Sequence, residues 1–117
     1  MDGGDILPAV FEVKGMKIIK KLSKHIDDEI EDAIHYAKLA LKCKEENKNL
    51  ATVFYNLSND ELKHATMLHA EVVRMIDEYR KVNGTPPAEM LAVYNYLHGE
   101  QIAKTNKAKN YQQMFRE

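Results

Sequence analysis

Apolar residues recur every three or four positions from Met16 to about Glu46, a stretch that contains neither proline nor glycine. This spacing is typical of one face of an amphipathic helix. The apolar positions are Ile19, Leu22, Ile26, Ile30, Ala33, Ala37 and Ala40 or Leu41. Lysine, aspartate and glutamate occupy most of the other positions, so we predict a first helix over residues 16–46.

A polar segment at residues 42–49 marks a turn, and a second apolar stripe follows over residues 50–82. Its members are Val53 or Phe54, Leu57, Glu61, His64 or Ala65, Leu68, Val72, Met75 or Ile76, and Tyr79. The sequence Asn-Gly-Thr-Pro-Pro at 83–87 ends this helix, because glycine caps helices and proline stops or restarts them. A third helix is predicted to begin near Ala88.

The two ends of the chain are less regular than the middle. Residues 1–15 contain three glycines and Pro8, so we expect an irregular arm there. The third helix and its polar tail cover residues 88–115, with apolar side chains at helical spacing near the end. This tail either docks on a partner or frays. Together these elements predict an all-α chain that forms one domain over residues 1–117.

Composition restricts the class of protein. The chain of 117 residues can build only a small core, which an oligomer would enlarge. Its net charge of −1 gives no indication of nucleic-acid binding. The single cysteine, Cys43, cannot form an internal disulfide. Because we find no signal peptide and no long apolar run, we expect a cytoplasmic protein without a membrane span.

Two polar residues interrupt the apolar stripe of the second helix. Glu61 and His64 are three positions apart, which places their side chains next to each other on one helix face. The motif Glu-x-x-His alone is weak evidence, but an ionised carboxylate in an apolar core is costly unless something pairs with it. The position of Glu61 and His64 on the apolar stripe therefore indicates that the two side chains bind one ion.

A third polar residue is predicted to reach the same place. Glu29 lies on the stripe of the first helix, 17 residues before a turn centred near residue 46, and Glu61 and His64 lie 15 and 18 residues after it. Because a helix rises about 1.5 Å per residue, an antiparallel hairpin brings all three to one level. We therefore predict a metal site made of Glu29, Glu61 and His64.

The ligand types indicate which metal. Two carboxylates and one imidazole suit iron or manganese better than zinc, which usually has four ligands rich in histidine or cysteine. Three ligands leave a site incomplete, whereas a two-fold dimer supplies four carboxylates and two imidazoles. Two hairpins also make a four-helix bundle, and this ligand set is that of a di-iron site in a bundle core.

The residues Glu29, Ala33 and Tyr36, followed by Asp-Glu-Leu-Lys-His-Ala at 60–65, resemble the ferritin-like superfamily, and rubrerythrin-type helices most closely. The resemblance covers residues 16–80. It implies an antiparallel helical hairpin that binds iron, with two ions per dimer and ferroxidase activity. It also implies that Glu29 is a bridging or terminal ligand, Glu61 a bridging ligand and His64 a terminal ligand.

The chain departs from a full-length ferritin-like protein, because no second Glu-x-x-His follows residue 82. This half-size arrangement is similar to the encapsulated ferritins, which complete their site at a two-fold interface, so we expect a homodimer or a higher homo-oligomer. The chain also lacks the paired Cys-x-x-Cys motifs of a rubredoxin-like domain, which argues against rubrerythrin-type peroxidase chemistry.

Several alternatives stay open from the sequence. Asp32 could replace Glu29, and other residues could serve as outer ligands or cap the site; these are His25, His35, His69, His98 and Glu100. Manganese could replace iron. The protein could also be a helical interaction module that keeps the ferritin-like fold, binds no metal, and engages a protein partner through its third helix.

Overall fold

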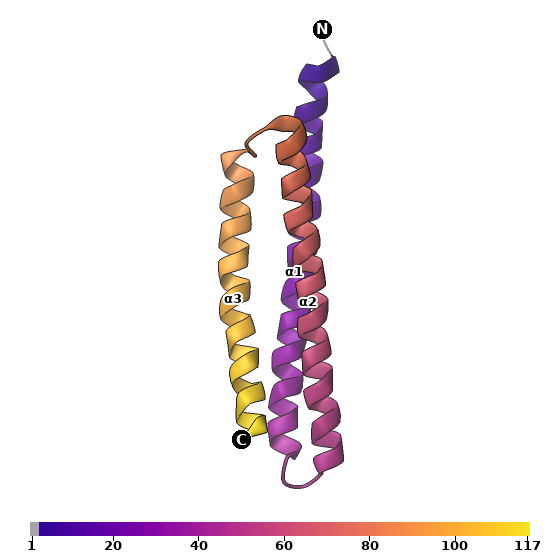
Figure 1. Cartoon of the computed structure of the whole chain (residues 1–117), viewed down its shortest axis with the longest axis vertical. Helices are drawn as coiled ribbons and strands as arrows, with labels where there is room; N and C mark the ends of the chain where they lie inside the picture. The colour runs from indigo at the N-terminus through magenta and orange to yellow at the C-terminus, as the bar shows by residue number, and fades with distance from the viewer. Residues whose placement is uncertain (1–2) are drawn as a thin grey trace.

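The computed structural model contains three long helices, and it describes the backbone of residues 3–117 and the side-chain surroundings of residues 15 and 17–117. The helices are α1 (Gly3–Cys43), α2 (Lys48–Asn83) and α3 (Ala88–Arg116), and no strand occurs in the described range. The helices α1 and α2 form an antiparallel hairpin, with α3 alongside (Figure 1). The molecule measures 70 × 18 × 18 Å. The prediction of an all-α chain is confirmed.

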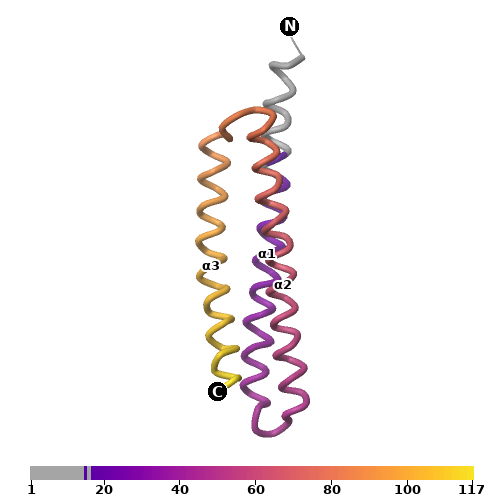
Figure 2. The backbone as a smooth tube through the Cα atoms, in the orientation of Figure 1, coloured from indigo at the N-terminus to yellow at the C-terminus, as the bar shows by residue number. Residues whose placement is uncertain are grey.

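The connections between helices lie close to their predicted positions. The first turn spans residues 44–47, and the side-chain oxygen of Asn47 caps α2 by accepting a hydrogen bond from the backbone N–H of Leu50 at 3.1 Å. Gly84 ends α2 with a φ of 81°, and its N–H donates to the carbonyl of Arg80 at 2.9 Å. The chain then turns back so that α3 runs in the same direction as α1 (Figure 2).

The expected irregular arm over residues 1–15 is wrong for most of its length, because α1 begins at Gly3. Residues 1–2 lie outside the described part of the chain. A glycine inside a helix costs only about 1 kcal/mol relative to alanine, which is too little to end a long helix. Packing also supports α1 here, since a Cβ atom at Gly15 would lie 3.6 Å from the Cε atom of Met90 in α3.

Small residues let α1 and α2 approach each other closely. On α2 the buried positions Ala51, Ser58, Ala65, Val72 and Tyr79 recur every seven residues, the spacing of a helix that pairs along one seam. Three alanines of α1 nearest the turn are fully buried; they are Ala33, Ala37 and Ala40. Farther from the turn, α1 contributes Ile19, Ile26 and Ile30 to the apolar core.

Buried glutamines attach α3 to the hairpin. Gln101 donates from Nε2 to the backbone carbonyl of Ser23 in α1 at 3.2 Å. Eleven residues later, Gln112 donates to Ser58 Oγ at 2.8 Å, and Ser58 Oγ donates to the carbonyl of Ala33 at 2.7 Å. This second chain of hydrogen bonds joins all three helices. Because each buried donor has one matching acceptor, the two glutamines set the register of α3.

The C-terminal tail is helical and contacts its own hairpin. Phe115 stacks on Tyr55 of α2 with ring centroids 4.8 Å apart, and Arg116 donates a hydrogen bond to the Tyr55 hydroxyl at 2.7 Å. That bond holds the pKa of Tyr55 below its usual range. Lys38 of α1 lies over the ring of Tyr111, 5.4 Å from its centroid. The tail therefore does not fray in this structure.

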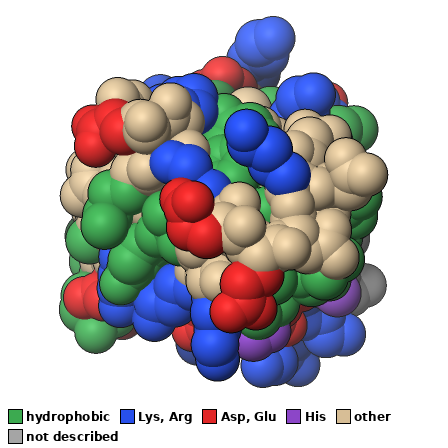
Figure 3. Space-filling view, turned by 90° about the horizontal axis from the view of Figure 1, so that it is seen from below, with side chains coloured by type: hydrophobic (Ala, Val, Ile, Leu, Met, Phe, Trp, Pro, Cys, Tyr) green, Lys and Arg blue, Asp and Glu red, His purple; other side chains and the backbone are tan. Residues whose placement is uncertain are grey.

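The surface at the turn end of the rod carries both signs of charge, with hydrophobic side chains between them (Figure 3). Among the described residues, no helix has a stretch that is both long and apolar enough to cross a membrane.

Candidate functional site

The structure brings Glu29 of α1 together with Glu61 and His64 of α2. The Nδ1 atom of His64 lies 3.6 Å from a carboxylate oxygen of Glu29 and 3.7 Å from one of Glu61. One ligand atom from each residue lies within 4.8 Å of the other two. We call these three residues the Glu-Glu-His cluster. The convergence predicted from the spacing to the turn is therefore present.

The register of the hairpin explains this convergence. Tyr36, seven residues after Glu29, stacks on Phe54, seven residues before Glu61, with ring centroids 6.1 Å apart and planes 20° from parallel. Seven residues are close to two helical turns, so the cluster lies two turns farther from the connecting turn than this aromatic pair. The stacked rings thus hold α1 and α2 in the register that places the two glutamates opposite each other.

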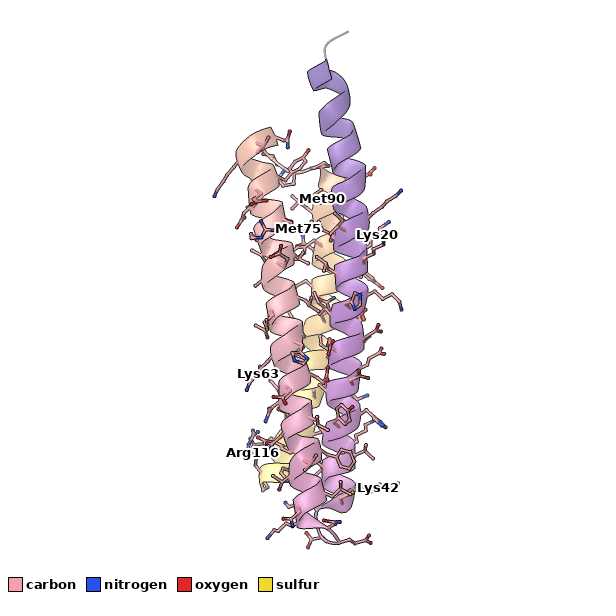
Figure 4. The ribbon with its side chains drawn as sticks, turned by 90° about the vertical axis from the view of Figure 1, so that its right-hand side faces the viewer. Lys20, Lys42, Lys63, Met75, Met90 and Arg116 are labelled. Atoms are coloured by element: carbon pink, nitrogen blue, oxygen red, sulfur yellow. The ribbon has the colours of Figure 1, made fainter. Side chains whose placement is uncertain are left out.

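The cluster lies on the side of the hairpin that α3 does not cover. On α1, Asp27 and Glu31 contact Lys104 of α3, at 3.8 Å and 3.1 Å. Glu29 is two residues from each of them, and residues two apart on a helix point in nearly opposite directions. In Figure 4, α1 and α2 are in front and α3 lies behind them. The side in front is the one that remains uncovered.

The uncovered side carries apolar residues on both sides of the cluster, together with Glu71 and Glu78 seven and fourteen residues after His64, and we call it the open face. Each apolar residue assigned to it lies seven, eleven or fourteen positions from a cluster residue, spacings that keep residues on one helix face. The half-buried members are Leu22, Tyr36, Phe54, Leu57, Leu68 and Met75. The exposed members are Ile18, Leu50 and Val53, which are 45%, 40% and 51% exposed.

The cluster is partly exposed in the single chain, and its predicted burial in the bundle core of a dimer stays a prediction. The side chains of Glu29 and Glu61 are 28% and 18% exposed, and that of His64 is 54% exposed. The physical reason is the position of α3, which covers the opposite side of the hairpin and leaves this side in contact with solvent. Only another molecule packed on the open face could exclude water from the cluster.

The alternative ligands suggested by the sequence lie elsewhere. Within the described part of the chain, the only group of three metal-binding side chains whose ligand atoms converge is the Glu-Glu-His cluster. Asp32 and His25 are exposed on α1 and do not join it. The ring of His35 contacts Tyr36 at 6.1 Å instead. Glu100 is exposed on α3, where its charge acts on Lys104.

His69 and His98 form a separate contact between α2 and α3 that the sequence analysis did not identify. Their rings lie 4.6 Å apart and 20° from parallel, and Nε2 of His69 is 3.0 Å from the hydroxyl of Tyr94. Burial, and to a lesser extent the neighbouring His98, lowers the pKa of His69, while burial raises the pKa of Tyr94. Burial thus disfavours the charged forms of His69 and Tyr94. The sequence alone does not predict the contact between His69 and His98, because it depends on where α3 packs.

Comparisons with protein-family models, with curated proteins and with solved structures found no match to this chain.

The chemistry of the cluster is that of a partial metal site. Two carboxylate oxygens and one imidazole nitrogen suit divalent iron or manganese. Ligand atoms that share one ion through bonds of about 2.1 Å lie at most about 4.2 Å apart, and the two distances to His64, 3.6 Å and 3.7 Å, meet this condition. Both glutamates thus lie close enough to His64 to share an ion with it, and the two glutamate oxygens lie within 4.8 Å of each other. Three ligands from one chain leave further positions open.

Proposed function

We propose that this chain is a ferritin-like iron-binding protein that forms a homodimer through its open face. Two hairpins would make a four-helix bundle, and two Glu-Glu-His clusters would face each other across its two-fold axis. The observation that carries this proposal is the convergence of Glu29, Glu61 and His64 within 4.8 Å on an apolar face that α3 leaves uncovered.

The exposed apolar residues support a dimer on this face. Leu50 and Val53 are 40% and 51% exposed on α2, and they lie on the same helix face as the half-buried Leu57 and Leu68. Contiguous exposed apolar surface around polar groups is typical of an interaction site. A two-fold contact is self-complementary, so the same face serves both partners. Such packing would also bury His64, the most exposed cluster residue.

The charges of the cluster support a pair of divalent ions. Two chains contribute four carboxylates, which balance the charge of two ferrous ions and make their shared burial tolerable. His64 must be neutral to act as a ligand, so we expect iron binding to weaken as the pH falls. The chemistry that a pair of bound ferrous ions supplies is reaction with oxygen. We therefore propose ferroxidase activity for the dimer.

The experiment that tests this function adds ferrous ions to the protein in air and follows oxygen consumption together with ferric absorbance. We expect the wild type to oxidise iron faster than buffer alone. Substitution of a residue that only orients a metal ligand typically lowers metal affinity or activity 10- to 100-fold. Substitution of a ligand should lower them more. We therefore expect Glu61→Gln to lower the rate at least about tenfold.

Asp60→Asn is the matched control, because Asp60 is exposed and adjacent to Glu61 but lies outside the cluster. We expect its oxidation rate to equal that of the wild type. Equal rates for wild type, Glu61→Gln and buffer would exclude ferroxidase activity.

One observation favours a second function. His64 lies within 4.0 Å of both glutamates, so a protonated imidazole pairs the two carboxylates without any metal. On this second proposal the chain is a helical interaction module that docks a partner and binds no metal. Manganese and iron content of the purified protein distinguishes the two, since the module contains neither. Removal of residues 84–117 should then abolish partner binding.

A further inference from the structure

One helix carries an unusual separation of charge. Four lysines lie on α1 between Gly15 and Ile26, where no acidic residue occurs; they are Lys17, Lys20, Lys21 and Lys24. The acids that follow are Asp27, Asp28, Glu29, Glu31 and Asp32, and no lysine occurs from His25 to Ala37. On α2 the two signs are instead mixed, and Arg74 pairs with both Glu71 and Glu78.

Most of these charges lie on the outer side of α1, away from α2. The lysines and both Asp28 and Asp32 are exposed. In Figure 4, Lys20 projects from the side of α1 that is opposite α2. Asp27 and Glu31 already contact Lys104 of α3, which leaves Asp28 and Asp32 as the acids farthest from α3 on this side. We call the exposed side chains of Lys20, Lys24, Asp28 and Asp32 the outer face.

An apolar groove adjoins the basic half of the outer face. It lies between α1 and α3, has a volume of about 530 Å³, and is bordered on the α1 side by Lys20, Ser23, Lys24 and Asp27. On the α3 side its walls are Ala92, Val93, Tyr96 and Leu97. Tyr96 is 69% exposed, so its ring adds apolar surface at the edge of the groove. This surface combines an apolar hollow with a rim that carries two lysines and one aspartate.

The spacing of the charges points to the occupant of this surface. Lys24 and Asp28 are equally far from residue 26, and so are Lys20 and Asp32. When two copies of one helix cross in opposite directions about that point, each lysine meets an aspartate. Parallel crossing places lysine against lysine, which is repulsive. A contact in which residue i meets residue j and j meets i is the defining property of a two-fold interface.

We propose that the outer face of α1 docks on the same face of a second copy, antiparallel and with a two-fold axis that meets the outer face at the height of residue 26 along α1. Lys20 then pairs with the partner's Asp32, and Lys24 with the partner's Asp28. Surface ion pairs individually contribute little to affinity, so they set register and orientation. The exposed Tyr96 and the groove beside it supply apolar surface that the second copy covers.

This interface is separate from the open face and does not depend on iron. Lys20 and Lys24 border α3, whereas Glu29 and the other open-face residues point away from it. A molecule that uses both faces assembles beyond a dimer, through two different two-fold contacts.

Sedimentation equilibrium of charge-reversed full-length chains tests the interface. We expect Lys20→Glu with Lys24→Glu to weaken one association step at least about tenfold, because like charges then face each other. Asp28→Lys with Asp32→Lys should weaken the same step equally. The chain that carries all four substitutions regains opposite charges at every pair, so its association should return to within about threefold of the wild type.

Circular dichroism shows whether each variant folds, and all four positions are exposed, so we expect helical spectra unchanged from the wild type. Raising the sodium chloride concentration from 0.05 to 0.5 M should weaken the wild-type step, because salt screens exposed charges. The proposal is overturned if neither double variant changes association. It is also overturned if the four substitutions together fail to restore association, because the lysines then bind something other than a second copy.

Discussion

Ser58 shows how a single side chain connects the three helices. It is fully buried, accepts a hydrogen bond from Gln112, and donates one to the carbonyl of Ala33. A buried donor that loses its acceptor cannot be satisfied by water. The hydroxyl of Ser58 therefore contributes more to stability than its small size suggests.

We expect Ser58→Ala to lower the free energy of unfolding by about 1–3 kcal/mol, because Gln112 Nε2 is left buried without an acceptor. Urea unfolding followed by circular dichroism measures this. Thr66→Ala is the matched control: Thr66 is exposed on the same helix and donates only to the carbonyl of Leu62, at 3.0 Å. The control should change stability by no more than about 0.5 kcal/mol. Equal effects of both substitutions would contradict this role.

His69 should make stability depend on pH. Burial and the neighbouring His98 hold its pKa below the ordinary value in the folded chain. The unfolded chain therefore binds a proton more readily, and the favourable contribution of neutral His69 is present above about pH 6.5 and is lost as the pH falls below that value.

Thermal unfolding between pH 8 and pH 5 measures this dependence. We expect the wild type to lose more stability over this range than His69→Gln, which cannot titrate at that position. Thr66→Ala, at an exposed position of the same helix, removes no titratable group and should keep the slope of the wild type. A wild type and a His69→Gln variant with identical slopes would rule out the contribution of His69.

At the residue scale, the sequence predicts residues that break a pattern. Glu29, Glu61 and His64 interrupt apolar stripes, and their distances from the turn predict that they meet. Ser58 and Gln112 break no visible pattern, because serine and glutamine are common at many helix positions. Their role follows from the way α3 packs, which helical periodicity does not contain.

At the element scale, glycine has opposite effects at two positions. Gly84 needs its positive φ of 81°, which side chains with a Cβ atom rarely adopt. Gly99 lies inside α3, and a Cβ atom there would meet nothing within 4 Å. Gly99 therefore weakens α3 without providing a contact.

We expect Gly99→Ala to raise the free energy of unfolding by about 0.5–1 kcal/mol, because alanine restricts the unfolded chain and favours the helix. Gly84→Ala should lower it by about 1–3 kcal/mol, because its backbone is strained with a Cβ atom. Urea unfolding of both variants measures whether each substitution raises or lowers the free energy of unfolding. A Gly84→Ala variant as stable as the wild type would contradict the need for glycine at this positive φ.

Helix boundaries could be predicted where the sequence contains residues that strongly favour a turn. The Asn-Gly pair at 83–84 ends α2 at Asn83, and α3 begins at Ala88 as expected. The start of α1 was not predictable, because glycine and Pro8 near the N-terminus resemble loop signals. The packing of Gly15 near Met90 belongs to tertiary structure, which a local pattern does not report.

At the scale of the whole molecule, the position of α3 decides which side of the hairpin remains uncovered. Periodicity predicts apolar faces on α1 and α2, but it does not predict which face a third helix covers. The structure places α3 away from the Glu-Glu-His cluster. It therefore leaves the cluster accessible to a second copy, as the proposed dimer requires.

Val53 tests whether the open face is an interface, because it is 51% exposed in the single chain. We expect Val53→Lys to remove the association step made by the open face and so to lower the mass of the assembly, since an unpaired lysine is costly in an apolar contact, and to leave the helical spectrum unchanged. Light scattering measures the mass in solution. Met114→Lys is the matched control, because Met114 is 52% exposed on α3. If both variants keep the wild-type mass, the open face is not the dimer interface.

The most direct test of the central claim is an anaerobic titration of the metal-free protein with ferrous ions, with Glu61→Gln titrated in parallel. The proposed dimer, which holds two ions between two hairpins, predicts saturation at about one ion per chain for the wild type. It also predicts no saturable binding for Glu61→Gln. A wild type that binds no iron, or a variant that binds as much as the wild type, would contradict the account.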